Sequence, residues 1–120
     1  MRNIEALREY CLAKKGVTES FPFGGDTLVF KVIGKVFALT GIDAQPLSIN
    51  LKMDPELVEG YREKFTAVQP GYHMNKKHWN TVGVEDAALP LNELKWMIDH
   101  SYDEVVKKMP KKLKTELNQL

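Results

Sequence analysis

Residues 47–53 alternate strictly between apolar and polar side chains, and this pattern restricts the fold more than any other feature of the sequence. The alternation separates two sets, Leu47, Ile49, Leu51 and Met53 on one side and Ser48, Asn50 and Lys52 on the other. A period of two predicts a strand with one face against a core and the other in water. The chain therefore needs a sheet and a layer that covers one of its faces.

Further strands are indicated on both sides of this segment. Residues 27–33 and 36–39 are rich in β-branched and aromatic side chains, and Gly34-Lys35 separates them. Glycine at the first of two loop positions predicts a hairpin with a type II′ turn. Residues 66–69 are expected to form a short extended piece and residues 78–82 another strand.

Three helices are predicted. Residues 3–15 carry Ile4, Leu7 and Cys11 at helical spacing, and a second helix opens with Asp54 as N-cap and Pro55 in its first turn. The longest begins at Pro90 and repeats apolar residues as far as Met109. Pro110 should break it, which leaves residues 111–120 as a short second helix or a fraying tail.

Residues 17–26 are predicted to be a connection, because most of them are turn formers. Phe21 and Phe23 lie within it, and we expect them to hold this loop across the core. The element order is then α-β-β-β-α-β-β-α over one domain, residues 1–120. The simplest architecture is a two-layer α+β fold, an antiparallel sheet with helices on one face.

Cysteine content and hydropathy favour a cytoplasmic protein. Cys11 is the only cysteine, so an internal disulfide is impossible and a reducing compartment is indicated. Its place in line with Ile4 and Leu7 predicts a small buried hydrophobe and not a nucleophile. The N-terminus lacks the apolar core of a signal peptide, and no apolar run approaches the length of a membrane span.

The segment of residues 70–80, Pro-Gly-Tyr-His-Met-Asn-Lys-Lys-His-Trp-Asn, has an unusual composition. It holds two aromatic residues, two histidines, two lysines, two asparagines and no acid. Neither a helical nor a strand period runs through it, so burial does not explain it. A turn needs Pro, Gly and Asn but does not need the other residue types.

These residues resemble the signature of the MmcQ/YjbR family. Further matches are Phe21-Pro22-Phe23-Gly24, Val29-Phe30-Lys31-Val32, Phe37-Ala38-Leu39, Asn50-Leu51-Lys52, Ile98-Asp99-His100-Ser101-Tyr102-Asp103 and Lys108-Met109-Pro110-Lys111-Lys112. The resemblance covers nearly the whole chain. It implies a small α+β fold similar to that of secretion-chaperone-like proteins. It also implies DNA binding, through a comparison of two projecting β wings with other DNA-binding folds.

Several residues of the 70–80 segment are candidate nucleic-acid contacts. Lys76 and Lys77 would neutralise phosphates, and Tyr72 or Trp79 would stack on bases or pack on sugars. Asn75, Asn80 and His78 would donate hydrogen bonds to phosphate oxygens, and His73 is a further candidate contact. The alternative is a structural loop in which Tyr72 and Trp79 are partly buried and Asn75 closes a turn.

Two further basic segments are candidates. Lys35 lies at the tip of the predicted hairpin, where it either enters a groove of DNA or keeps the tip soluble. Residues 107–114 hold five lysines, Lys107, Lys108, Lys111, Lys112 and Lys114. They would form a phosphate-binding arm, or place cations at a helix C-terminus. Since the formal net charge is only +1, this asymmetry along the chain carries more information than the total.

Catalytic and metal sites are not indicated. Asp99-His100-Ser101 contains the residue types of a hydrolase triad, but consecutive helical residues point about 100° apart. His73, His78 and His100 with Cys11 do not have the spacing of a zinc site. We therefore expect a protein that is not an enzyme and needs no metal or cofactor.

The leading hypothesis is a DNA-binding protein with little sequence preference. The rival is a protein-interaction or chaperone-like module that holds a peptide on the sheet or the 70–80 segment. A weaker alternative is a small-molecule sensor with a pocket beneath Tyr72 and Trp79. Convergence of the three basic segments on one face would favour DNA binding. Interruption of that face by Glu59, Glu63 or Glu104 would favour the interaction module.

Overall fold

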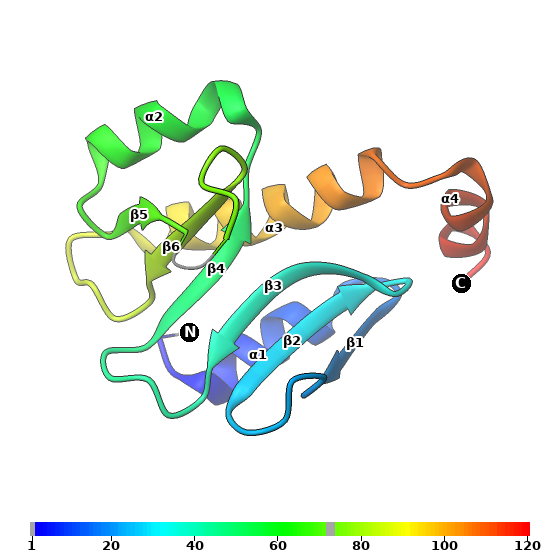
Figure 1. Cartoon of the computed structure of the whole chain (residues 1–120), viewed down its shortest axis with the longest axis horizontal. Helices are drawn as coiled ribbons and strands as arrows, with labels where there is room; N and C mark the ends of the chain where they lie inside the picture. The colour runs from blue at the N-terminus through cyan, green and yellow to red at the C-terminus, as the bar shows by residue number, and fades with distance from the viewer. Residues whose placement is uncertain (1, 72–73) are drawn as a thin grey trace.

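A computed structural model describes residues 2–71 and 74–120 (Figure 1). In chain order the elements are α1 (Ile4–Leu12), β1 (Val17–Ser20), β2 (Thr27–Val32), β3 (Lys35–Gly41), β4 (Ser48–Lys52), α2 (Pro55–Lys64), β5 (Val68–Pro70), β6 (Trp79–Gly83), α3 (Leu91–Lys107) and α4 (Lys111–Asn118). The strands form one antiparallel sheet in the order β1-β2-β3-β4-β6-β5. The predicted α+β class, with an antiparallel sheet and helices on one face, is confirmed.

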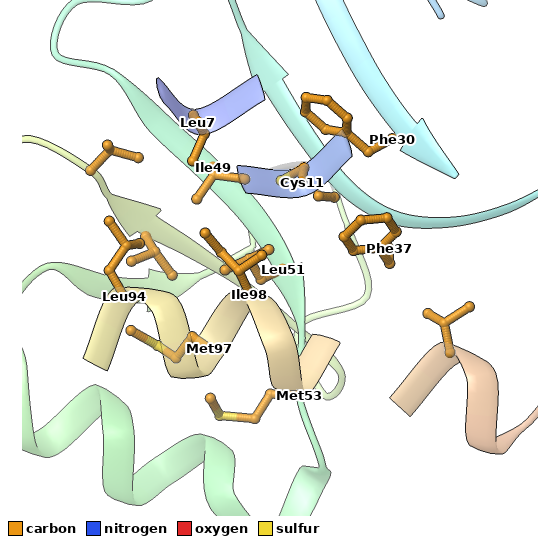
Figure 2. Packing of buried hydrophobic residues seen from close by; sticks show 14 of the residues in the cluster. Leu7, Cys11, Phe30, Phe37, Ile49, Leu51, Met53, Leu94, Met97 and Ile98 are labelled. Carbon is orange, nitrogen blue, oxygen red and sulfur yellow. The ribbon is translucent and has the colours of Figure 1, made fainter. Parts of the chain in front are cut away.

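The core lies between the sheet and the helices α1 and α3, which are behind the sheet in Figure 1. The alternating strand is β4, and its apolar side chains Ile49 and Leu51 point toward Met97 and Ile98 of α3 (Figure 2). Cys11 belongs to the same core and is fully buried, as predicted. Helix α2 joins this layer through Tyr61, whose ring stacks on that of Trp96 of α3 at 5.4 Å.

The hairpin between β2 and β3 forms, but its turn lies one residue earlier than predicted. Ile33 and Gly34 occupy the two loop positions with φ of 45° and 79°, which is the type I′ pattern, and Val32 pairs with Lys35. A bulge at Phe30–Lys31 then shifts the register. The bulge allows the neighbouring residues Phe37 and Ala38 both to be buried.

Residues 17–20 differ from the sequence-based expectation, whereas residues 111–118 form the short helix that was one of its two alternatives. Residues 17–20, predicted to be part of a connection, form β1, an edge strand paired with β2. Phe21 and Phe23 do not cross the core, because they are 45% and 75% exposed. Residues 111–118 form the regular helix α4, which Leu117 anchors: a Cβ on Gly16 would lie 2.7 Å from Leu117 Cδ1.

Strands β3 and β4 pair at only two positions, Ala38 with Leu51 and Leu39 with Asn50, and then separate (Figure 1). At the separation the Oγ of Ser101 in α3 accepts a hydrogen bond from the Lys52 N–H at 2.8 Å and donates one to the Phe37 carbonyl at 2.6 Å. Ser101 therefore supplies the hydrogen bonds that these two backbone groups no longer receive from a neighbouring strand. This separation creates the space in which the candidate site lies.

Candidate nucleic-acid interface

A groove of about 430 Å³ lies where β3 and β4 separate, at the C-terminal end of α3. Three lysines line it, Lys35 from β3, Lys52 from β4 and Lys108 from the end of α3. The rest of its wall is apolar and consists of Val36, Val105, Met109 and Pro110. The groove thus combines ammonium groups with a hydrophobic surface.

Lys52 and Lys108 are close enough for the charge of one to act on the other. Lys52 is half-buried, and burial is the main cause that lowers the pKa of its ammonium group. The positive charge of Lys108 lowers this pKa further, while the negative charge of Glu104 acts in the opposite direction. An added anion would stabilise the charged forms of both lysines.

His78 connects the 70–80 segment to this groove. Burial lowers the pKa of its imidazole, and three ammonium groups lower it further, those of Lys108, Lys52 and Lys77. Its Nδ1 is buried and has no hydrogen-bond partner in the described part of the chain. Lys77 and His78 from the loop therefore belong to the same positive cluster as the strand and helix lysines. The hairpin tip at Lys35 and the C-terminal segment at Lys108 thus meet at this groove, and His78 of the 70–80 segment lies within range of the charges of Lys52 and Lys108.

The turn that carries these residues is held from inside the loop and from α2. Asn75 accepts hydrogen bonds from the backbone of Lys77, through its Oδ1 at 2.9 Å, and from the Trp79 N–H, through its carbonyl at 2.9 Å. Arg62 of α2 donates from Nη2 to the carbonyl of Lys76 at 2.6 Å. Asn75 thus closes the turn as the structural alternative expected, although its exposed position leaves it near solvent.

Arg62 was not predicted from the sequence, and it donates three hydrogen bonds to the 70–80 segment. Its Nε donates to Oδ1 of Asn80 at 2.8 Å and its Nη2 also reaches the carbonyl of Trp79 at 3.2 Å. It lies in a helix that precedes the 70–80 segment, and nothing in the local sequence separates it from an ordinary solvated arginine.

The prediction that Asn80 contacts nucleic acid is wrong. Asn80 is 1% exposed, and its amide is engaged by Arg62 and by the sulfur of Met53. Its position in β6 points it toward the core side of the sheet, so a ligand in solvent cannot reach it.

Trp79 is half-buried. Gly71 approaches its backbone so closely that a Cβ on Gly71 would lie 2.9 Å from the Trp79 carbonyl oxygen. The glycine therefore permits the two ends of the loop to meet, where the Gly71 N–H donates to that oxygen at 2.9 Å. Tyr72 and His73, the other aromatic candidates, lie outside the described residues.

Lys76 lines a different groove from that of Lys35 and Lys52. This second groove lies against α2 and is lined by Pro55, Glu56, Val58, Glu59, Arg62, Lys76 and Lys77. Glu56 and Glu59 make its charge mixed. Lys76 and Lys77 thus both line a groove that contains acids, and the charge of Lys77 also acts on His78.

The C-terminal lysines lie in different surroundings. Lys108 lines the basic groove, while Lys107 is ion-paired with Glu104 at 3.5 Å. Lys111 and Lys112 are exposed on α4 and are not among the residues that line the groove. Only Lys108 of this segment therefore has a geometric relationship to Lys35, Lys52 and His78.

Comparison with known proteins agrees with this architecture. The YjbR family model matches residues 12–104. The chain belongs to the YjbR family. It is 33% identical over 117 residues to the uncharacterized protein YjbR of Escherichia coli K12, with 98% of each chain covered. It is 36% identical over 110 residues to the uncharacterized protein YbdF of Escherichia coli O157:H7, covering 90% of this chain and 88% of the relative.

Solved structures share the YjbR-family fold. Deinococcus radiodurans protein DR2400, with a DUF419 domain, is 40% identical and superposes with a TM-score of 0.90 over 98% of this chain and 89% of its own. A protein from Pseudomonas syringae is 30% identical, with a TM-score of 0.74 over 86% of this chain and 98% of its own. The names of these YjbR relatives state no activity, so they establish family and fold.

The family-like residues Asp99, His100 and Ser101 have separate partners. Asp99 accepts hydrogen bonds from the Tyr10 hydroxyl and from Lys14, while His100 Nε2 accepts one from the Asp54 N–H at 3.1 Å. Ser101 lies between the strands, so the three side chains do not converge on one point.

Within residues 2–71 and 74–120 no group of three or more His, Cys, Asp or Glu could hold a metal. None of the helices described is long and apolar enough to cross a membrane.

Proposed function

We propose that this YjbR-family protein binds the phosphate backbone of DNA, with little sequence preference, through the basic groove. The contacts are Lys35, Lys52, Lys77 and Lys108, with His78 assisting. The observation that carries the proposal is that Lys35, Lys52 and Lys108 come from three separate segments and line one groove. Lys77 and His78 come from a fourth segment, and the charges of Lys52, Lys77 and Lys108 act together on His78. Elements distant in sequence thus place positive charge together, which a set of independently solvated lysines has no reason to do.

The side chains of the groove favour phosphate over base recognition. Specific base contacts in DNA are made mostly by Arg, Lys, Asn and Gln, and of these only lysine lines the groove. Lysine acts on phosphate as a point charge. Four neutralised phosphates would give a slope of log K against log salt of about −3.6, a loss on the order of 100-fold in affinity between 50 and 200 mM salt.

The test is fluorescence anisotropy with a labelled duplex over a salt series, comparing wild type with Lys35→Ala/Lys108→Ala. The matched control is Lys64→Ala/Lys95→Ala, which removes the same charge from positions that line other surfaces. We expect the groove variant to lose at least about fivefold in affinity at low salt and to flatten the salt slope by about two. Absence of wild-type binding at low salt, or an equal loss in the control, would refute the proposal.

A protein-interaction module is the second candidate, and a different surface favours it. A hollow of about 370 Å³ on the open face of the sheet is lined by uncharged residues, among them Phe23, Leu39, Asn50 and Met74. Phe23 is 75% exposed, which is unusual for phenylalanine. An extended apolar peptide would suit this hollow. Probing an array of such peptides with wild type and Phe23→Ser tests it, since binding that ignores Phe23 would remove this candidate.

A further inference from the structure

Glu104 is a buried acid beside the basic groove. It lies on α3 between Val105, which lines the groove, and Asp103, which is exposed. Its side chain is only 7% exposed. Its ion-pair partner Lys107 is 67% exposed, and the Lys107 Nζ lies 3.5 Å from Oε2 of Glu104. A carboxylate is seldom buried to this extent without several close partners.

The surroundings of Glu104 are predominantly positive. On its own helix these are Lys107 and Lys108, and Asp103 is the neighbouring acid. On the other elements, the charge of Glu104 raises the pKa of Lys52 in β4 and the pKa of His78 in the loop. The neighbouring lysines lower both pKa values, so Glu104 acts against them. Glu104 therefore supplies the negative charge that partly balances the cluster.

We infer that the Glu104 carboxylate is an internal anion that competes with phosphate for the lysines of the basic groove. This inference rests on the proposed function, and it names Glu104 as the group that regulates phosphate binding in the groove. A phosphate in the groove would face the same lysines and be repelled by the carboxylate, so Glu104 weakens binding and keeps the empty groove from a large excess of positive charge. Exchange of the intramolecular anion for a phosphate would make the interaction weak and readily reversible.

An ordinary helical ion pair is the competing explanation for Glu104. Pairs between residues three apart on a helix contribute little when one partner is exposed. Such a role would involve Lys107 alone. It would leave the groove lysines and the imidazole of His78 unaffected.

The experiment compares Glu104→Gln with Asp103→Asn. Both variants remove one negative charge, both are close in shape to the original residue, and the positions are adjacent on α3, so general effects of net charge are matched. Glu104→Asp keeps the charge and serves as the packing control. Circular dichroism and thermal unfolding confirm that each variant is folded.

Two measurements are made on each variant. Anisotropy with the labelled duplex at low salt should show Glu104→Gln binding about three- to tenfold more tightly than Asp103→Asn, with Glu104→Asp close to wild type. NMR titration without DNA should show that the pKa of His78 falls in Glu104→Gln and stays near its wild-type value in Asp103→Asn.

Equal affinities of Glu104→Gln and Asp103→Asn, with wild type binding DNA, would overturn the inference and leave the proposed function in place. An unchanged pKa of His78 in Glu104→Gln would also overturn it, because the carboxylate would then lie outside the cluster. If wild type and all variants fail to bind DNA, the proposed function fails and the inference falls with it.

Discussion

Arg62 Nε donates a 2.8 Å hydrogen bond to Oδ1 of Asn80, which joins helix α2 to the start of β6 at the end of the 70–80 segment. The acceptor is 1% exposed, so the guanidinium reaches into the interior to make this bond. The same group donates to the carbonyls of Lys76 and Trp79. One side chain therefore fixes both the base and the crest of the turn that presents Lys77 and His78.

Arg62→Ala should destabilise the protein and loosen this turn. The variant loses three charge-assisted hydrogen bonds, and one of these losses leaves a buried amide oxygen unpaired. We therefore expect the free energy of unfolding to fall by about 2–3 kcal/mol. Urea denaturation measures this loss. Hydrogen exchange should accelerate in peptides that cover residues 74–80 more than in those that cover β2 and β3.

The matched control is Arg8→Ala, which removes an arginine paired with Glu19 on the surface. It should change neither stability nor exchange in residues 74–80 appreciably. Uniformly faster exchange in Arg62→Ala would mean that this arginine stabilises the whole fold and has no particular role in the turn.

Ser101→Ala should weaken the junction at which β3 and β4 separate. The Lys52 N–H and the Phe37 carbonyl would lose their common partner in a place that water reaches poorly, at a cost of about 2–3 kcal/mol. Ser20→Ala, on the exposed edge of β1, is the control and should be nearly neutral. Chemical denaturation of the two variants checks the difference, and equal stabilities would show that the serine bridge contributes nothing net.

Cys11 should be almost unreactive in the native protein. Burial raises the pKa of its thiol to about 12, so near pH 8 the reactive thiolate is about a thousand times scarcer than for a thiol of pKa 9. We expect labelling by a thiol reagent such as dithionitrobenzoate only at the rate of unfolding, and rapid labelling in denaturant. Stoichiometric labelling within seconds under native conditions would contradict the buried placement.

The fold could be predicted where local pattern and tertiary environment agree. The alternation of residues 47–53 is visible because β4 packs one face against α3 and leaves the other open. Strand β1 was missed because Val17–Ser20 is short and polar and becomes a strand only by pairing with β2. The hairpin turn was placed one residue too late because Ile33 adopts a positive φ, which a β-branched residue rarely does.

The sequence predicted that the candidate site would be basic, but it did not predict which residues would form it. The unusual residues of the 70–80 segment mark the loop, and the structure brings His78 within range of the charges of Lys52 and Lys108. Lys52 was counted only as a polar residue on the wet face, because its proximity to Lys108 depends on the separation of β3 and β4. Asn80 looked like a contact because its burial follows from strand register, which the segment does not reveal.

Titration of His78 should make stability depend on pH. Its folded-state pKa lies below the ordinary value of 6.5 because of burial and of Lys108, Lys52 and Lys77. Well above pH 6.5 the imidazole is neutral in both states and has no effect. As the pH falls below that value, the unfolded chain takes up the proton first, so stability is lost until the pH passes the folded-state pKa. Urea denaturation between pH 8 and pH 5 should therefore show a steeper acid-side decline for wild type than for His78→Gln, and parallel curves would place His78 outside the positive cluster.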